Sequence, residues 1–590
     1  MNPLSPPPPT ARSLPTRKSY NMSTVHFDYI IVGGGLSGSV VANRLYNANT
    51  SLHILLVEAG VDASDNTLIP YANNTAFLIG CDLDWGFVTT PQQNLEGRKI
   101  GNPAGKCLGG GTAINNCGWI RGDRSDYDRW AEIVGDESYS YDSMLPYFTA
   151  TEKYTDGSQT DGQQHGSDGP LYVASVSSTG RQYPLREPLA QAWDENHVSA
   201  LPGLDGNRGS PQGRAELAED RRDGLRQLAS AAYPLDGIHV MTNTLVRRII
   251  TTSEDNTPKA IGIEAISGEK YYGREIIISA GAYRTPQLLM LSGIGPGEVL
   301  SQHGIPAVVD APDVGRNLYD HLEFAQYWKL KDPSKGYALG SDNPLFTKPE
   351  FGLGVPVDWV VTTSVPRDGL VEAITADEGC PPSADHPLLK AERSFLEYIV
   401  LYAAGSASDP VIPLDGTHIC ITIIGLLPTS KGHVTINSTD PTNPPVIDPN
   451  YLSTEVDRYA WRTGLRTATR LFLGTDSGSS LIDQETPPDG FEPISLDSSD
   501  EYLEARARHG ALCVYTWPFP TDLTNEGSST YHPMGTCSMG KVVDNRFQVH
   551  GISNLRVVDA SVIPTPIAAH IQAALYAMAV KAADIIASKV

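Results

Sequence analysis

The chain has 590 residues, of which 40% are hydrophobic and 19% charged, and its formal net charge is −24. This composition is typical of a globular protein of two domains or one elaborated domain, and it excludes a fibrous or disordered chain. The negative charge argues against nucleic acid and anionic membranes as partners, because both are bound by basic patches.

The N-terminal segment 1–24 is rich in proline, serine and threonine and contains no acidic residue. It lacks an apolar run of signal-peptide length, so we expect a disordered leader, or an upstream extension ahead of Met22, and an intracellular, cytoplasmic protein. A transit peptide is the weaker alternative, because the segment shows no amphipathic pattern. No run of about eighteen apolar residues occurs, and we expect no membrane span. The seven cysteines are widely spread and predict neither a disulfide framework nor a metal site, although one disulfide is left open.

The segment from Asp28 to Gly60 predicts a strand–helix–strand unit that binds a dinucleotide. An apolar run leads into a G-x-G-x-x-G turn formed by Gly33, Gly35 and Gly38, and helical spacing follows. These glycines permit the tight turn, the approach of a pyrophosphate and close helix packing, in that order. Glu58 ends the second strand, where it can accept hydrogen bonds from a ribose diol. An ordinary glycine turn is the weaker alternative, and FAD and NAD both stay open here.

A second glycine-rich segment runs from Gly105 to Trp130. Three consecutive glycines at 109–111 permit close backbone approaches, and the hydrogen-bonding residues Thr112, Asn115 and Asn116 follow at once. Such a loop can be a simple connector, but the dense polar and aromatic residues after it favour a binding loop.

Four segments resemble motifs of the glucose-methanol-choline (GMC) oxidoreductases, which are FAD enzymes. They are the glycine fingerprint at 33–38, the loop 105–130, GAYRTPQLLMLSGIGP at 281–296 and YHPMGTCSMG at 531–540. Two shorter pieces agree, DVGRNLYDHL at 313–322 and LRVVDASVIPTP at 555–566. The segments occur in family order from about residue 28 to the end of the chain. The resemblance implies FAD rather than NAD.

The resemblance implies an α/β (α+β) fold, with a Rossmann-type FAD-binding domain and a discontinuous, sheet-based substrate domain. The FAD-binding domain is expected at 25–180, 235–322 and 525–590, and the substrate domain at 181–234 and 323–524. Alternating apolar residues at 417–427 and 432–437 agree with strands in the second domain, and residues 237–278 predict strands that return to the first.

The family motifs also imply further residues around FAD. Val246 would lie against the adenine, Asp559 and Ala560 beside the pyrophosphate, and the backbone of 115–117 against the flavin ring. The residues at 115–117 are Asn115, Asn116 and Cys117. The remaining expected contacts come from Ser37, Ala59, Trp85, Gly110, Thr112, Gly118 and Gln572. The common G-G-S-S loop reads G-G-G-T here, and no histidine stands at 113 or 114, so we expect FAD to be bound non-covalently.

Two histidines near the C-terminus are the candidate catalytic residues. His532 lies on a loop broken by proline and glycine, and His570 precedes an apolar helical pattern that starts near Gln572. Each alone could be structural, but the family motif places both over the flavin. Alcohol oxidation needs a base for the O–H proton while hydride leaves the carbon, and imidazole suits that task. We expect His532 to be the base and His570 to bind the substrate oxygen, with hydride passing to flavin N5.

Other polar and aromatic residues are expected to have more modest roles. His321 and His550 are expected to be structural, and Cys117 and Cys537 to lie near the site without redox chemistry. Aromatic residues are scattered between 323 and 520, and most of them are expected in the core: Tyr327, Trp328, Trp359, Tyr398, Tyr515 and Trp517.

The sequence therefore predicts an FAD-dependent oxidase or dehydrogenase of a small primary alcohol, with oxygen or a quinone as electron acceptor. We expect an aromatic or polyketide-derived substrate in fungal secondary metabolism. A redox-neutral cyclase or lyase resembling versicolorin B synthase, in which FAD is structural, is the first alternative, because fold does not fix reaction. A non-catalytic flavin-binding protein is the second, and the presence of both histidines argues against it.

Overall fold

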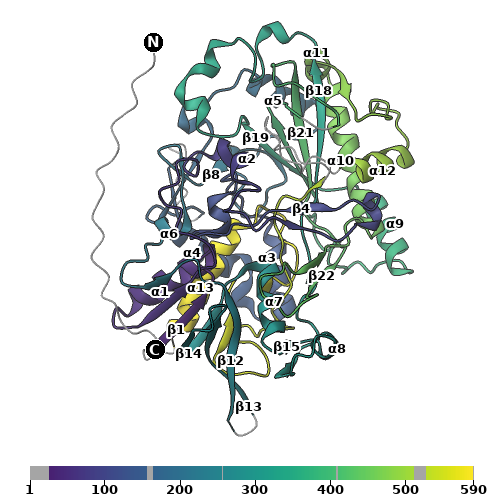
Figure 1. The fold of residues 1–590 in the computed structure, drawn as a ribbon. Coiled ribbons are helices and arrows are strands. Elements are labelled where there is room, and N and C mark those ends of the chain that lie inside the picture. The colour runs from purple at the N-terminus through teal and green to yellow at the C-terminus, as the bar shows by residue number, and fades with distance from the viewer. Residues whose placement is uncertain (1–25, 156–163, 255–256, 407–408, 511–526, 589–590) are drawn as a thin grey trace.

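The computed structural model describes residues 26–155, 164–254, 257–406, 409–510 and 527–588 (Figure 1). The expected leader 1–24, Cys513, Tyr515 and Trp517 lie outside these ranges. Within them, no helix is both long and apolar enough to cross a bilayer. The six cysteines in these ranges are all free.

A seven-stranded sheet forms one end of the molecule (Figure 1). Its strands follow the order β11 (His239–Met241), β2 (Ile54–Val57), β1 (His26–Val32), β14 (Lys270–Ile278), β13 (Thr257–Ala265) and β12 (Val246–Glu254), and β26 (Leu555–Val557) also pairs with β14. The strands β11, β2, β1, β14 and β26 are parallel, and their isoleucine and valine runs are buried. The strands predicted within 237–278 are confirmed.

Two helices from opposite ends of the chain pack together beside this sheet. They are α1 (Leu36–Ala48), which follows the glycine turn, and α13 (Gln572–Ala587). The buried side of α13 is rich in alanine, which lets the two helices approach closely. A third helix, α7 (Gly281–Leu291), begins where β14 ends. The helix predicted to start near Gln572 is confirmed.

A six-stranded sheet forms the other end of the molecule. Its order is β24 (Ile482–Thr486), β18 (Glu323–Leu330), β21 (His418–Gly425), β20 (Leu396–Leu401), β19 (Trp359–Thr363) and β7 (Gly213–Glu216). The helix α10 (Glu455–Leu473) covers one face, where a side chain at Gly464 would contact Ile423 and Leu396. The strands predicted at 417–427 and 432–437 are confirmed as β21 and β22 (Gly432–Thr435).

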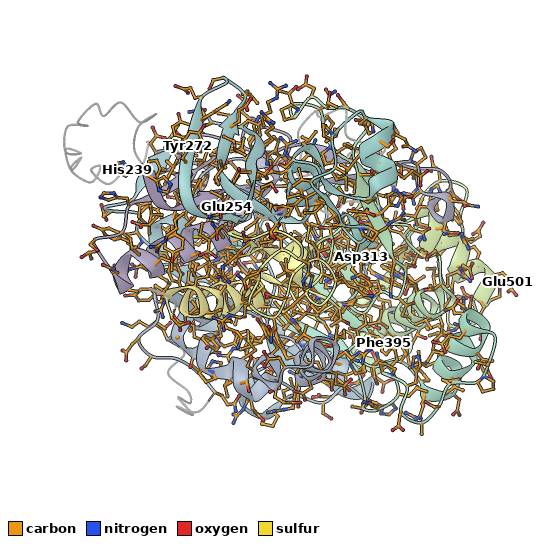
Figure 2. The ribbon with its side chains drawn as sticks, turned by 90° about the horizontal axis from the view of Figure 1, so that it is seen from below. His239, Glu254, Tyr272, Asp313, Phe395 and Glu501 are labelled. Carbon is orange, nitrogen blue, oxygen red and sulfur yellow. The ribbon has the colours of Figure 1, made fainter. Side chains whose placement is uncertain are left out.

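The other described elements connect or flank the two sheets. Figure 2 shows His239 and Tyr272 of the seven-stranded sheet on one side of the molecule and Glu501 of α12 (Asp500–His509) on the opposite side. The expected domain limits at residues 180, 235, 322 and 525 stay a prediction. The flanking helices are α2 (Thr75–Leu78), α3 (Arg124–Val134), α4 (Tyr141–Thr151), α5 (Arg186–Glu195), α6 (Ala229–Ala232), α8 (Gly297–Gln302), α9 (Arg367–Glu378) and α11 (Asp476–Leu481). The flanking strands are β3 (Phe87–Val88), β4 (Ile100–Asn102), β5 (Glu152–Tyr154), β6 (Leu171–Ser175), β8 (Ala218–Glu219), β9 (Arg221–Arg222), β10 (Leu225–Arg226), β15 (Ile294–Gly295), β16 (Val309–Asp310), β17 (Arg316–Leu318), β23 (Val446–Asp448) and β25 (Gly527–Ser528).

Candidate active site

A cavity of about 360 Å³ extends from the glycine turn to the six-stranded sheet. All but one of the residues predicted for the site line it, although they come from distant parts of the chain. They are Gly33, Gly35, Ser37, Glu58, Ala59, Trp85, Gly110, Thr112, Asn115, Asn116, Cys117, Gly118, Val246, His532, Asp559, Ala560, His570 and Gln572. The cavity thus brings the predicted set together, and the role of each residue stays a prediction.

The exception is Gly38, which does not line the cavity. A side chain on Gly38 would meet the backbone oxygen of Gly33 at 1.9 Å. Gly33 itself has φ +107°, which favours glycine, and a side chain there would meet the oxygen of Ser279 at 2.2 Å. Gly38 therefore acts through packing of α1 on the turn, which is the role that the third glycine of this pattern has.

The carboxylate of Glu58 is held by the backbone at the end of β2. One oxygen accepts the Gly34 N–H at 2.8 Å and the other accepts the Gly60 N–H at 2.8 Å. Burial raises the pKa of Glu58 above its usual value. A carboxylate oxygen has two lone pairs, so these bonds leave acceptor capacity toward the cavity that a ribose diol could use.

The loop at 112–118 is fixed by a buried cation that the sequence analysis did not identify. The Arg226 guanidinium donates to the carbonyl and side-chain oxygens of Asn115 and, at 2.8 Å, to the hydroxyl of Thr75. Gln572 accepts from the Asn115 amide at 3.0 Å and donates to the Gly118 carbonyl at 2.7 Å. No local sequence pattern indicates the role of Arg226, because the residues to which it donates are more than 100 positions away in the chain.

An unsatisfied buried atom in this loop supports a polar cofactor. The side-chain oxygen of Asn116, a residue that lines the cavity, is buried and has no hydrogen-bond partner within the described part of the chain. Buried polar atoms of native proteins are almost always paired. Gly33 and Gly35 also line the cavity, and neither contributes a side chain to it. The residues present therefore fit the FAD that the sequence motifs imply.

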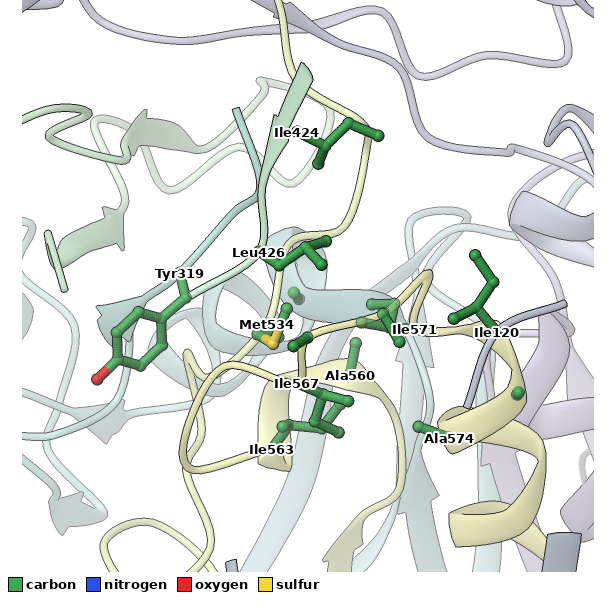
Figure 3. Packing of buried hydrophobic residues seen from close by; sticks show 14 of the residues in the cluster. Ile120, Tyr319, Ile424, Leu426, Met534, Ala560, Ile563, Ile567, Ile571 and Ala574 are labelled. Atoms are coloured by element: carbon green, nitrogen blue, oxygen red, sulfur yellow. The ribbon is translucent and has the colours of Figure 1, made fainter. Parts of the chain in front are cut away.

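The two candidate catalytic histidines are neighbours. The ring centroids of His532 and His570 lie 4.9 Å apart at an interplanar angle of 71°. The backbone N–H of His532 donates to the buried carboxylate of Asp320 at 3.0 Å. Figure 3 shows the buried side chain of Met534, two residues further on, below that of Leu426, which follows β21. The loop is thus held from both sides, which gives His532 a fixed position.

The environments of the two histidines push their pKa values in opposite directions. Burial lowers the pKa of His532 well below its usual value, and the neighbouring His570 and His321 lower it further. Burial also disfavours charge on His570, but the carboxylate of Glu397 outweighs it, and the pKa of His570 is raised. The His570 Nε2 atom lies 2.7 Å from a Glu397 oxygen. Such a split is typical of a base and its acidic partner.

The roof of the cavity is one face of the six-stranded sheet. Glu323 and Glu397 both lie opposite Ile424 of β21, so the three side chains form a row across the strands. Burial, followed by the nearby Glu397, raises the pKa of Glu323 to about 8. One oxygen of each carboxyl group is buried, and no residue that the structure describes forms a hydrogen bond with it. The sequences of β18 and β20 indicate this pair of acids, because an acidic residue within an otherwise apolar strand is unusual.

The roof is aliphatic rather than aromatic. Besides Glu323 of β18, the roof residues that line the cavity are Ile399 and Leu401 of β20 and Thr422 and Ile424 of β21. Tyr327, Trp328, Trp359 and Tyr398 are buried elsewhere and do not line the cavity. The expectation that most of the scattered aromatic residues belong to the core therefore holds for these four.

Three residues without a predicted catalytic role differ in how they relate to the site. His321, which we expected to be structural, places its Nδ1 atom 3.1 Å from Nδ1 of His532 and so contacts the candidate base directly. Cys117 lines the cavity and Cys537 is buried outside its lining. Burial raises the pKa of the Cys117 thiol to about 11 and that of Cys537 further, which disfavours reactive thiolates.

Comparisons with known proteins agree over nearly the whole chain. Two models of the GMC oxidoreductase family match residues 27–323 and 428–579. The GMC-type oxidoreductase acuG of Aspergillus aculeatus is 41% identical over 95% of this chain and 99% of its own length. An oxygen-dependent choline dehydrogenase of Photobacterium profundum is 34% identical over 95% of this chain and 93% of its own. A solved formate oxidase from Aspergillus oryzae has a TM-score of 0.81 at 27% identity, with 96% of this chain and 99% of that chain covered.

Proposed function

Because this chain belongs to the GMC oxidoreductase family, it is an FAD-dependent oxidoreductase, and we propose that it oxidises a primary alcohol. The aliphatic roof favours a substrate with an apolar body. The proposed alcohol is aromatic or polyketide-derived and belongs to fungal secondary metabolism. The substrate class and the place in fungal secondary metabolism rest on the sequence resemblance and on the fungal origin of the 41% identical relative.

The observation that carries this function is the adjacent pair His532 and His570 at the cavity, with opposite pKa shifts. Neutral His532 can accept the hydroxyl proton. His570, held by Glu397, can donate a hydrogen bond to the alcohol oxygen and share the negative charge that develops there.

Each residue of the site has a role that follows from its position. FAD, when bound, supplies the acceptor for the hydride that leaves the alcohol carbon. Gly33, Gly35 and Glu58 would hold its dinucleotide part, and the loop at 112–118 with Gln572 would hold its ring system without a covalent bond. The aliphatic roof excludes water and orients the alcohol above that loop. The proposed final electron acceptor is either oxygen or a quinone.

An anaerobic titration with primary alcohols tests the proposal. The purified yellow protein is mixed with a panel that includes benzylic and long-chain alcohols, and the absorbance of oxidised flavin is followed. We expect at least one alcohol to bleach it, and readmitted air or an added quinone then identifies the acceptor. Bound flavin that no alcohol reduces would favour the redox-neutral cyclase instead.

His532→Ala tests the assignment of the base. Loss of a positioned general base costs about 10²- to 10⁴-fold in rate. We therefore expect flavin reduction to slow by that factor while FAD stays bound, as checked by the absorbance ratio at 280 nm and the flavin band. An unchanged reduction rate would contradict the assignment.

A further inference from the structure

His532 lies in a hydrogen-bonding environment that discriminates between its two ring nitrogens. Its Nδ1 atom is 2.9 Å from the hydroxyl oxygen of Thr530 and 3.1 Å from Nδ1 of His321. The rings of His321 and His532 are nearly perpendicular, at 85°. Both neighbours therefore meet His532 at the same ring atom.

The strand-like pairing of two segments produces this arrangement. The chain around Tyr319–Leu322 runs antiparallel to that around Ser529–Met534, with isolated bridges at both ends. The Thr530 N–H donates to the His321 carbonyl at 2.9 Å, and the Thr530 hydroxyl oxygen lies 3.0 Å from the same carbonyl. A carbonyl can only accept, so the single proton of the hydroxyl is donated to it.

The position of this proton fixes the proton of His532. Because the Thr530 oxygen has no second proton, it can only accept from Nδ1 of His532. If Nδ1 carried no proton, two lone pairs would face each other at 2.9 Å in a largely buried site. Nδ1 of His321 is then a second acceptor for the same N–H. We infer that Thr530 and His321 hold His532 as the Nδ1–H tautomer, which leaves the lone pair on Nε2 as its proton-accepting atom.

The state of His321 agrees with this assignment. His321 is fully buried, and burial followed by the nearby His570 lowers its pKa to about 3, so it is neutral at ordinary pH. A neutral imidazole has one protonated nitrogen and one acceptor nitrogen. With Nδ1 accepting, His321 carries its proton on Nε2, which is buried and has no hydrogen-bond partner among the described residues. The two neighbouring histidines therefore have opposite tautomers.

The consequence for catalysis rests on the proposed function. Once His532 takes a proton at Nε2, its Nδ1–H belongs to an imidazolium and becomes a stronger donor to the same two acceptors. Thr530 and His321 are thus positioning residues, because they touch the base and not the substrate. Outer partners that orient metal-ligating histidines in the same way change activity by about 10- to 100-fold when they are removed, and we expect an effect of that size here.

Nuclear magnetic resonance of the holoenzyme tests the tautomer without a substrate. The protein is labelled with [¹⁵N]histidine, and long-range ¹H–¹⁵N correlations are recorded at neutral pH. The signals that disappear in His532→Ala and in His321→Leu assign the two rings. We expect the unprotonated nitrogen of His532 to couple to both carbon-bound ring protons, which identifies Nε2, and that of His321 to be Nδ1. An unprotonated Nδ1 in His532 would overturn the inference.

A matched pair of variants tests the role of the hydroxyl. Thr530→Val removes it at nearly constant shape, and Thr530→Ser keeps it. We expect Thr530→Val to slow anaerobic flavin reduction by about 10- to 100-fold with an unchanged KM and flavin spectrum, and Thr530→Ser to restore most of the rate. Equal rates for the two variants would overturn the inference. The rate of His532→Ala then shows which part has failed. A wild-type rate of flavin reduction in His532→Ala would mean that the proposed base is wrong. A slow rate in that variant would mean that only the positioning role of Thr530 is wrong.

Discussion

At the scale of single residues, the main feature of the site is that the adjacent histidines His532 and His570 favour opposite protonation states. Among the described residues, the groups that contact the His532 ring are Thr530, His321 and His570, whereas His570 has the Glu397 carboxylate at 2.7 Å. One charge on one strand of the roof therefore decides which histidine accepts a proton and which retains one. Because the two rings interact, a rate profile will report pKa values of the pair.

Glu397→Gln is expected to move the alkaline limb of the rate profile. The carboxylate raises the pKa of His570, so its removal lowers that pKa and the protonated form is lost at a lower pH. Each unit of this fall reduces the protonated fraction above the pKa about tenfold. We expect kcat/KM of Glu397→Gln to decline earlier as pH rises than in the wild type. The matched control is Glu323→Gln in the same row, and an equal displacement in both variants would contradict the assignment.

Glu323→Gln is expected to change the pH dependence of stability. The pKa of Glu323 is about 8 in the folded protein, against an ordinary value of 4.5. Between these pH values the unfolded chain loses a proton that the folded chain keeps, so folding becomes less favourable as pH rises. A neutral amide removes this cost. The free energy of unfolding of the variant should match the wild type near pH 4 and exceed it at pH 9, by about 1.4 kcal/mol for each unit of pKa shift. A more stable wild type at pH 9 would contradict this.

The turn between β1 and α1 is the element on which the cofactor end of the cavity depends. Gly38→Ala places a methyl group 1.9 Å from the backbone oxygen of Gly33, and backbone cannot move aside as a flexible side chain can. We expect a loss of about 1–3 kcal/mol in stability and weaker FAD retention on gel filtration. Gly352→Ala is the control, because a side chain there meets nothing within 4 Å. Full FAD retention in Gly38→Ala would contradict the packing role.

Elements with a strong local pattern could be predicted from the sequence. The glycine turn, the apolar strands β1 and β2 and the helix from Gln572 each carry their signal within about 20 residues. The contacts Glu397–His570 and Arg226–Asn115 could not be predicted, since their partners are 173 and 111 residues apart. The contact of His321 with His532 depends on an antiparallel pairing of irregular segments that leave no periodicity.

At the scale of the whole molecule, the cavity is the place where distant parts of the chain meet. Its lining combines residues from the first third of the chain, the six-stranded sheet and the C-terminal segment 530–575. The seven-stranded sheet likewise recruits β26 from the C-terminal end beside β14. A group bound in this cavity contacts parts of the chain that are more than 500 residues apart. Its binding should therefore stabilise the folded molecule as a unit.

Removal of FAD is expected to lower the stability of the whole molecule. A ligand that binds only the folded state stabilises it by about 2.7 kcal/mol when its free concentration is 100 times Kd. We expect apoprotein made by mild acid and high salt to unfold at a lower temperature than the holoprotein, and added FAD to restore the difference in a concentration-dependent way. Thermal unfolding should be followed by both far-ultraviolet circular dichroism and tryptophan fluorescence. Riboflavin, which lacks the dinucleotide part, is the control and should restore less, because it cannot contact the glycine turn or Glu58. An apoprotein as stable as the holoprotein would contradict the assignment of this cavity to FAD.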